Sequence, residues 1–260
     1  MEPDAKGHAI WNVCYKISSF EVDPTRKATV QTLCKIMQEA AWDHADVLGL
    51  GYPQMIERDL IWVLSRQKIQ VHHFPEWGET IRLRTWPTGA QRLFAFREFQ
   101  IFNEKDALIG EAKGAWLVLD SKSRRPIWVQ PLFAQMEIPA GKGLFQGDLE
   151  KLPSPKDYSM QPYFPVQYSD LDWYNHVNHV QYIEWILDSY PLETHVRFCI
   201  ASLEMDFLSE SRYGDEISVC TQKLGEDPPS YLHTLLRKRD DQEICVACIN
   251  WRERTEENGG

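Results

Sequence analysis

The feature that most constrains how this chain can fold is an internal repeat with a period of about 135 residues. The segment 74–83 (FPEWGETIRL) matches 210–219 (ESRYGDEISV), so that Gly78 aligns with Gly214. A second block aligns three residues of the first copy with three of the second, namely Ile109 with Ile244, Ala112 with Ala247 and Trp116 with Trp251. Because two separate blocks share nearly one offset, we expect two copies of one fold.

Each copy is predicted to contain a strand, one long helix and then a run of strands. Apolar residues at helical spacing predict a helix from about Thr29 to Leu48 in the first copy and one over 177–190 in the second. Alternating or continuous apolar runs predict strands at 10–22, 61–71, 80–87, 94–103, 110–120, 163–168, 198–208, 216–223, 231–238 and 243–252. A curved antiparallel sheet can wrap a single helix, so the pattern favours an α+β fold with two similar halves.

The two copies are separated by a stretch rich in Gly, Pro and Lys. Such composition is typical of a connecting segment. We therefore expect an N-terminal domain over 1–140, a linker over 141–160, a C-terminal domain over 161–252 and a polar tail over 253–260.

Charge and composition exclude several classes of protein. The formal net charge is −10, which argues against a general nucleic-acid binder. No apolar run approaches the length of a membrane span, and the first residues lack the basic and apolar regions of a secretory signal. We therefore expect a cytoplasmic protein whose six cysteines are reduced core thiols, including the C-x-x-C pair in a strand at Cys245 and Cys248. No compact metal-ligand pattern is present, so we predict no metal and no cofactor.

Polar residues that could carry chemistry gather in the second copy, within Tyr168–Tyr190. Asp170 or Asp172 is predicted to cap the second helix, with Asn175 and His176 in or just before its first turn. Taken singly, each residue is explained as well by a structural role, as a helix cap or a solvated side chain, as by a functional one. The corresponding turn of the first copy, 21–27, has no His or Asn. We therefore expect the first copy to shape a pocket and the second to supply reactive groups.

Several motifs carry a family resemblance that covers nearly the whole chain. They are LIWVLSRQKIQV at 60–71, EWGETI at 76–81, SDLDWYNHVN at 169–178 followed by a helix, and LEMDFLSESRYGDEI at 203–217. In these motifs the chain resembles the acyl-acyl carrier protein thioesterases of plants and bacteria. The resemblance implies a tandem double hot-dog fold, in which each half is a curved antiparallel sheet wrapped around a long helix. It also implies a role in fatty acid biosynthesis, the hydrolysis of acyl-acyl carrier protein to free fatty acid and carrier protein.

The resemblance places the reactive groups of the family on Asp172, His176 and Glu210. The family's Asn column falls on Tyr174, and an Asn follows one place later at Asn175. Either the local turn compensates and Asn175 serves, or Tyr174 takes its place.

The family's Cys column falls on Ser211, so a Cys nucleophile is excluded at that position. A Ser nucleophile would need an adjacent base. We prefer direct attack by water activated by Glu210, with His176 assisting or orienting it. Asp172 would fix the His or polarise the water, and backbone N–H groups near the start of the second helix would hold the oxyanion.

The acyl chain is predicted to lie in the first half, along the helix 29–48. Ala41 and Ala45 leave room there, and Trp62 and Trp116 could line the walls. The alternative is that these Ala residues only let the sheet pack closely against the helix.

The expected partner is acylated carrier protein, which is acidic. Because this chain is acidic too, docking would need a local basic patch. Candidate strings are Lys122–Arg125, Arg82 with Arg84, and Arg237–Arg239. The open alternatives are an acyl-CoA thioesterase, an enoyl-thioester hydratase on the same scaffold, and a non-catalytic module that binds acyl thioesters. The sequence does not decide between a monomer and a homodimer.

Overall fold

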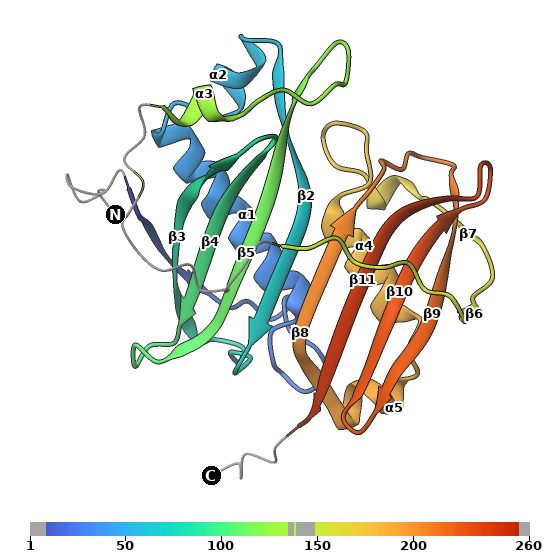
Figure 1. The fold of residues 1–260 in the computed structure, drawn as a ribbon. Helices are drawn as coiled ribbons and strands as arrows, with labels where there is room; N and C mark the ends of the chain where they lie inside the picture. Colours follow the sequence, from blue (N-terminus) through green and yellow to red (C-terminus); the bar gives the residue numbers. More distant parts are fainter. Residues whose placement is uncertain (1–8, 135–137, 139–148, 255–260) are drawn as a thin grey trace. The chain divides into compact units, whose positions relative to one another are not determined.

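The computed structural model describes residues 9–134, 138 and 149–254 (Figure 1). The chain divides between Leu149 and Glu150 into two compact units, and each is described by itself. The first part of the predicted linker (141–148) and the end of the predicted polar tail (255–260) lie outside the described residues. No described helix combines the length and the hydropathy that crossing a membrane requires.

The first unit is one antiparallel sheet with a long helix against it (Figure 1). The strand order is β1 (Trp11–Lys16), β3 (Thr80–Gln91), β4 (Phe94–Phe102), β5 (Leu108–Asp120) and β2 (Leu60–Val71). The long helix is α1 (Val30–Val47), and two short helices, α2 (Tyr52–Ile56) and α3 (Gln130–Phe133), were not predicted.

Helix α1 forms where the apolar spacing predicts it. The Thr29 hydroxyl caps its first turn by accepting the N–H of Thr32 at 3.1 Å. Just beyond its end, Gly49 adopts a φ of +70°, a conformation that glycine takes without steric cost. The predicted helix is confirmed, and its buried face carries Leu33, Met37, Ala40, Ala41 and His44.

The second unit repeats this plan (Figure 1). Its strand order is β8 (Phe198–Phe207), β11 (Gln242–Glu253), β10 (Pro229–Arg237), β9 (Glu216–Glu226) and β6 (Ser159–Met160), with β7 (Phe164–Pro165) also paired to β9. The 3-10 turn Tyr168–Asp170, the helix α4 (His179–Asp188) and the short helix α5 (Leu192–Arg197) complete it.

The structure explains why the repeat is visible in the amino-acid sequence. Gly78 precedes β3 with a φ of +89°, and Gly214 precedes β9 with a φ of +82°. Each donates its N–H to a carbonyl of a segment far away in sequence, Gly78 to that of Ile17 and Gly214 to that of Val166. Both copies therefore need glycine at the same turn, and the predicted architecture of two similar α+β halves is confirmed.

Several boundaries differ from the prediction. The first strand ends at Lys16 because Glu21 folds the chain back, accepting from the Tyr15 hydroxyl at 2.5 Å and the Ser18 N–H at 2.7 Å. The strand expected at 163–168 is reduced to Phe164–Pro165. The cysteine prediction is wrong at Cys14, which is exposed because it points outward from β1.

The interior of the second unit holds a buried imidazole, that of His233 on β10. Its Nε2 lies 2.7 Å from the Tyr190 hydroxyl, and its Nδ1 lies 3.0 Å from the Thr221 hydroxyl. Burial disfavours the charged form and lowers the pKa of His233 to about 3. The His233 imidazole is therefore neutral at every pH well above this pKa.

This depressed pKa predicts an acid-sensitive stability. Below pH ~6.5 the unfolded chain takes up a proton on His233 that the folded unit refuses, so stability falls as pH drops. Between pH 6.5 and 5 the loss is about 2 kcal/mol. His233→Gln, which is neutral at every pH, should remove that part of the slope in urea unfolding. Identical pH slopes for the two proteins would contradict the assignment.

Candidate active site

The segment Leu171–Val177 forms a closed loop in front of α4. Leu171 bridges to Val177, and the Asp172 N–H donates to the His176 carbonyl at 2.8 Å. The Asp172 side chain closes the loop from inside, since its Oδ1 accepts the N–H groups of Tyr174 at 2.8 Å and His176 at 3.2 Å. Asn175 has a φ of +60°, which Asn tolerates better than most residues.

The helix cap differs from the prediction. Helix α4 begins at His179, and Asn178 caps it by accepting the Val180 N–H at 3.0 Å. The expectation that Asp170 or Asp172 caps this helix is therefore wrong. Asp172 is occupied within the loop, which ends before the helix starts. In sequence, the Asn before the apolar residues of the helix was the signal for the true cap.

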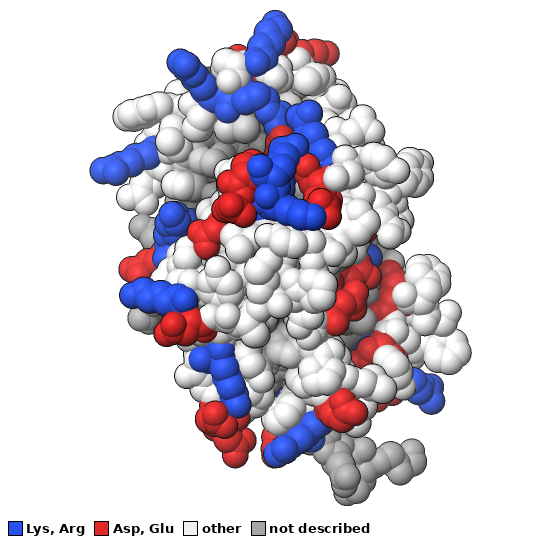
Figure 2. All heavy atoms as spheres, turned by 90° about the vertical axis from the view of Figure 1, so that its right-hand side faces the viewer, with Lys and Arg blue, Asp and Glu red and all other residues white. Residues whose placement is uncertain are grey.

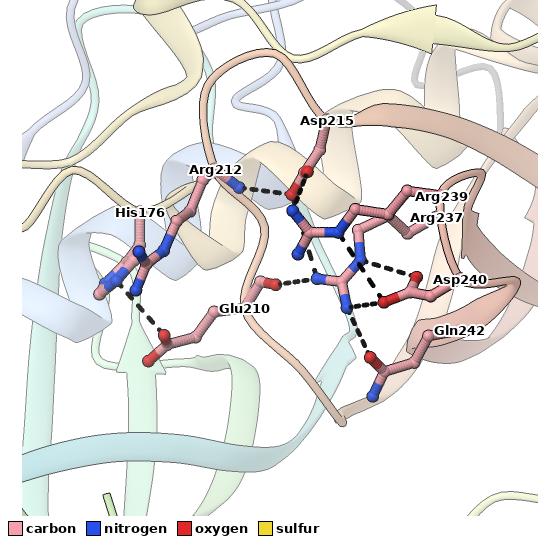
Figure 3. A network of polar contacts seen from close by, with 8 residues as sticks. All are labelled: His176, Glu210, Arg212, Asp215, Arg237, Arg239, Asp240 and Gln242. Atoms are coloured by element: carbon pink, nitrogen blue, oxygen red, sulfur yellow. Dashed lines mark hydrogen bonds and ion pairs between the residues drawn. The ribbon is translucent and has the colours of Figure 1, made fainter.

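A main-chain hydrogen bond joins the loop to a second segment of the same unit. The Val177 N–H donates to the Ser211 carbonyl at 2.9 Å, and this places His176 beside Glu210. The imidazole Nε2 lies 3.3 Å from the Glu210 Oε2 (Figure 3). The side chains are 22% and 36% exposed, so the pair keeps access to solvent and to a ligand.

Glu210 is held in place through its main chain. The guanidinium of Arg237 donates from Nη1 to the Glu210 carbonyl at 2.7 Å (Figure 3). Asp240 accepts from Arg237 Nε at 3.0 Å and from Nη2 at 2.7 Å, which fixes the plane of the guanidinium. The Arg237 side chain is only 6% exposed. Arg237 is therefore a buried brace, meaning a side chain that fixes the position of the Glu210 main chain.

Arg237 was missed as a site residue because the string Arg237–Arg239 was interpreted as a surface patch. Its position at the end of β10, two residues before an exposed Arg239, was the available signal. Asp215, which accepts the Arg212 N–H at 3.0 Å and pairs with Arg239 at 2.9 Å, closes the same network (Figure 3).

The remaining residues predicted for the site have different surroundings. Asp172 holds the main chain of His176, and no described contact joins its carboxylate to the imidazole. Asn175 is exposed. Ser211 is fully buried, and its Oγ has no hydrogen-bond partner among the described residues. Within those residues, no three His, Cys, Asp or Glu side chains gather as metal ligands.

A second imidazole lies next to the loop, on the first turn of α4. The ring of His179 packs edge-on against Phe207, with 5.7 Å between ring centroids. Burial lowers the pKa of His179 to about 4, so it is neutral near pH 7. This packing supports a structural role for His179 and leaves His176 as the imidazole that faces a carboxylate.

The residues predicted to hold an acyl chain lie in the first unit. Ala41 is buried on α1, whereas Ala45 is partly exposed. The Trp62 indole donates to the Leu50 carbonyl at 2.9 Å and packs on the apolar cluster around Leu50. The Trp116 indole folds back over Gly114, where a Cβ would come within 2.3 Å of it.

The basic strings considered for docking are partly neutralised. Arg237 is buried and is excluded as a docking residue. In Figure 2, basic side chains on the face shown lie beside acidic ones. The ion pairs of these strings include Arg82–Asp106, Lys122–Asp59, Lys238–Glu216 and Arg239–Asp215.

Comparison with known families agrees with this geometry. The model of the acyl-ACP thioesterase N-terminal domain matches residues 9–136, and that of the C-terminal domain matches residues 154–253. The chain belongs to the acyl-ACP thioesterase family. Both units, and the loop, Glu210 and Arg237 within the second, fall inside these matches.

Two curated members of the acyl-ACP thioesterase family illustrate the relation. The chloroplastic acyl-[acyl-carrier-protein] hydrolase FATB3 of Cuphea viscosissima is 28% identical over 270 residues, which cover 98% of this chain and 65% of the relative. The chloroplastic palmitoyl-acyl carrier protein thioesterase of Cuphea hookeriana is 29% identical over 259 residues, covering 92% and 61%. The chain thus spans a little over three fifths of the length of these plant relatives.

Solved structures of acyl-ACP thioesterases share the fold. The enzyme from Bacteroides thetaiotaomicron superposes with a TM-score of 0.81 at 24% identity, covering 94% of this chain and 98% of its own. The 12:0-ACP thioesterase from Umbellularia californica gives a TM-score of 0.79 at 23% identity, covering 94% and 98%. The predicted tandem hot-dog fold is confirmed.

Proposed function

We propose that this chain hydrolyses acyl-acyl carrier protein thioesters to a free fatty acid and the carrier protein. The observation that carries the proposal is the His176–Glu210 pair, 3.3 Å apart and partly exposed, in a member of the acyl-ACP thioesterase family. A carboxylate beside an imidazole can take a proton from water and return one to a leaving thiolate.

The proposed reaction begins with Glu210 as the general base. Its carboxylate takes a proton from a water molecule as the water oxygen bonds to the thioester carbonyl carbon. His176 orients Glu210 and receives this proton from it, and then delivers one proton to the thiolate when the carbon–sulfur bond breaks. Backbone N–H groups near the start of α4 are assigned to the oxyanion. Asp172 contributes by holding the His176 main chain, and Asn175 remains a predicted participant.

Attack by water is preferred to an acyl-enzyme route. A Ser nucleophile needs access to the substrate and an adjacent base. Ser211 has neither among the described residues, because it is fully buried and its Oγ makes no hydrogen bond there.

The substrate carrier separates this proposal from its main alternative. An acyl-CoA thioesterase would use the same chemistry, and a non-catalytic module would bind either thioester without turnover. We expect kcat/KM to be higher for acyl-carrier protein than for acyl-CoA at matched chain lengths. Equal or higher values with CoA at every length would overturn the carrier preference, and no turnover with either would favour a binding module.

The two predicted domains are proposed to divide the work, with the N-terminal domain (1–140) shaping the acyl pocket and the C-terminal domain (161–252) supplying the reactive groups. A cytoplasmic location also remains a prediction from the sequence, and the plant relatives are named as chloroplastic.

The acyl site proposed along α1 predicts a shift in chain length. Ala41 is buried on the helix face, so Ala41→Phe should fill part of the site and shorten the preferred acyl chain by several carbons. Glu39→Phe, on the exposed side of the same helix, serves as the control. If Ala41 only packs against the sheet, the Phe variant should instead lose about 1–3 kcal/mol of stability with an unchanged chain-length profile.

A further inference from the structure

An arginine lies inside the first unit, on the face of the sheet that meets α1. Arg97 of β4 pairs in register with Gly114 of β5, the residue that the Trp116 indole covers. Its Nη1 donates to the His44 Nδ1 at 2.9 Å and to the Thr85 hydroxyl at 3.2 Å. Arg97 therefore stands beside the helix face proposed to contact the acyl chain, one turn from Ala41.

The charge of Arg97 has only neutral partners among the described residues. A guanidinium has no acceptor, so the His44 Nδ1 must accept the hydrogen bond and the imidazole is neutral. The Thr85 hydroxyl in turn donates a hydrogen bond to the Glu98 carbonyl at 2.9 Å. Burial lowers the pKa of Arg97 to about 10, which still leaves the group charged at neutral pH. A buried charge without a counter-charge is costly.

A second donor lies at the same place. The Trp11 indole stacks on the His44 ring, with 5.9 Å between centroids. Its Nε1–H is buried and has no hydrogen-bond acceptor among the described residues. Arg97 itself is half-buried and keeps some accessible surface. Arg97 lacks a counter-charge and the Trp11 indole lacks a hydrogen-bond acceptor among the described residues. A ligand that carries an oxygen group would supply the acceptor, and an anionic one would also supply the charge.

We propose that the first unit accepts acyl chains that themselves carry an oxygen group, with a carboxylate as the best match, and that Arg97 and Trp11 bind this group. The proposal rests on the proposed thioester hydrolysis and on the acyl site along α1. The thioester carbonyl is assigned to His176 and Glu210 in the second unit, so an oxygen that meets Arg97 belongs to the remainder of the acyl chain.

The carboxylate is favoured over a hydroxyl for a physical reason. Arginine binds carboxylates through two parallel N–H groups, and such charge-assisted hydrogen bonds are stronger than those to neutral acceptors. A carboxylate would also supply the missing counter-charge. A hydroxyl would satisfy the donors and leave the charge uncompensated.

The test compares three acyl-carrier protein substrates of one chain length, ending in a methyl, a hydroxyl or a carboxylate. Arg97→Met removes the charge and the donors, and Arg97→Lys keeps the charge. Arg58→Met is the matched control, since Arg58 is an exposed arginine of the same unit, in the turn before β2. Binding of α,ω-dicarboxylic and monocarboxylic acids of equal length to the wild-type protein is measured by calorimetry in parallel.

We expect wild-type kcat/KM to be highest for the carboxylate-ended chain. Arg97→Met should lower the preference over the methyl-ended chain by roughly 10- to 100-fold, with the Lys variant retaining part of it and the control unchanged. Wild-type protein should also bind the dicarboxylic acid more tightly. Methyl-ended turnover with no carboxylate preference and equal binding of both acids would overturn this inference alone. Absence of turnover with all three substrates would instead overturn the proposed function, and the calorimetric comparison would still decide this inference.

Discussion

Glu210→Gln should lower kcat for acyl-carrier protein hydrolysis by roughly 100- to 10,000-fold, the usual cost of losing a general base. The amide keeps the size of the side chain and can still contact the His176 Nε2, now 3.3 Å from the carboxylate. Because the main-chain carbonyl of Glu210 bonds to Arg237, the segment should stay in place. KM should change little if Glu210 acts on water and makes no essential contact with the acyl chain.

The neighbouring residue supplies the control. Ser211→Ala should leave most of the activity, because the Ser211 side chain is buried away from solvent. The opposite pattern, with Ser211→Ala inactive and Glu210→Gln active, would require a covalent acyl-serine route. An acyl group trapped on Ser211 and detected by mass spectrometry would establish that route.

Arg237→Met should lower both stability and turnover. Removing one partner of a buried ionic network leaves the others uncompensated, and such changes cost about 3–5 kcal/mol. The partly exposed Asp240 can regain water, so we expect the lower end of this range in urea unfolding. Since Glu210 loses its main-chain brace, kcat should fall at least tenfold even where the variant remains folded, with a smaller change in KM.

Two further variants separate these effects. Arg239→Met removes an exposed guanidinium, 60% accessible, from the same network and should change stability by under about 1 kcal/mol. Arg237→Lys keeps the charge but cannot reproduce the two-atom contact with Asp240, so it should recover stability better than turnover. Wild-type kcat in a folded Arg237→Met protein would show that Glu210 needs no brace.

The sequence predicted those parts of the fold that depend on local patterning. Helix α1 carries a hydroxyl cap, a buried stripe and a following glycine, all of which are local signals. The repeat was visible because a glycine with positive φ is required before both β3 and β9. The pairing of His176 with Glu210 came from the family resemblance, since the two residues are far apart in sequence.

The features that the sequence did not predict depend on which of several possible hydrogen bonds forms in the folded protein. Asp172 and Asn178 are both good helix caps by composition. The Asp172 Oδ1 accepts two N–H groups within the loop, so it does not cap the helix, and Asn178 is the cap instead. Similarly, residue type alone does not distinguish the buried Arg237 from the exposed Arg239. The difference is one of position, because Arg237 ends β10 whereas Arg239 lies in the turn that follows it.

The most direct test of the central claim is to measure both products of one turnover. Purified protein is mixed with acyl-carrier protein, and carrier thiol and free fatty acid are quantified together by mass spectrometry. We predict equal amounts of the two products, formed at a rate that falls at least 100-fold in Glu210→Gln. Failure of the wild-type protein to release carrier thiol from any chain length, or release at the wild-type rate by Glu210→Gln, would contradict it.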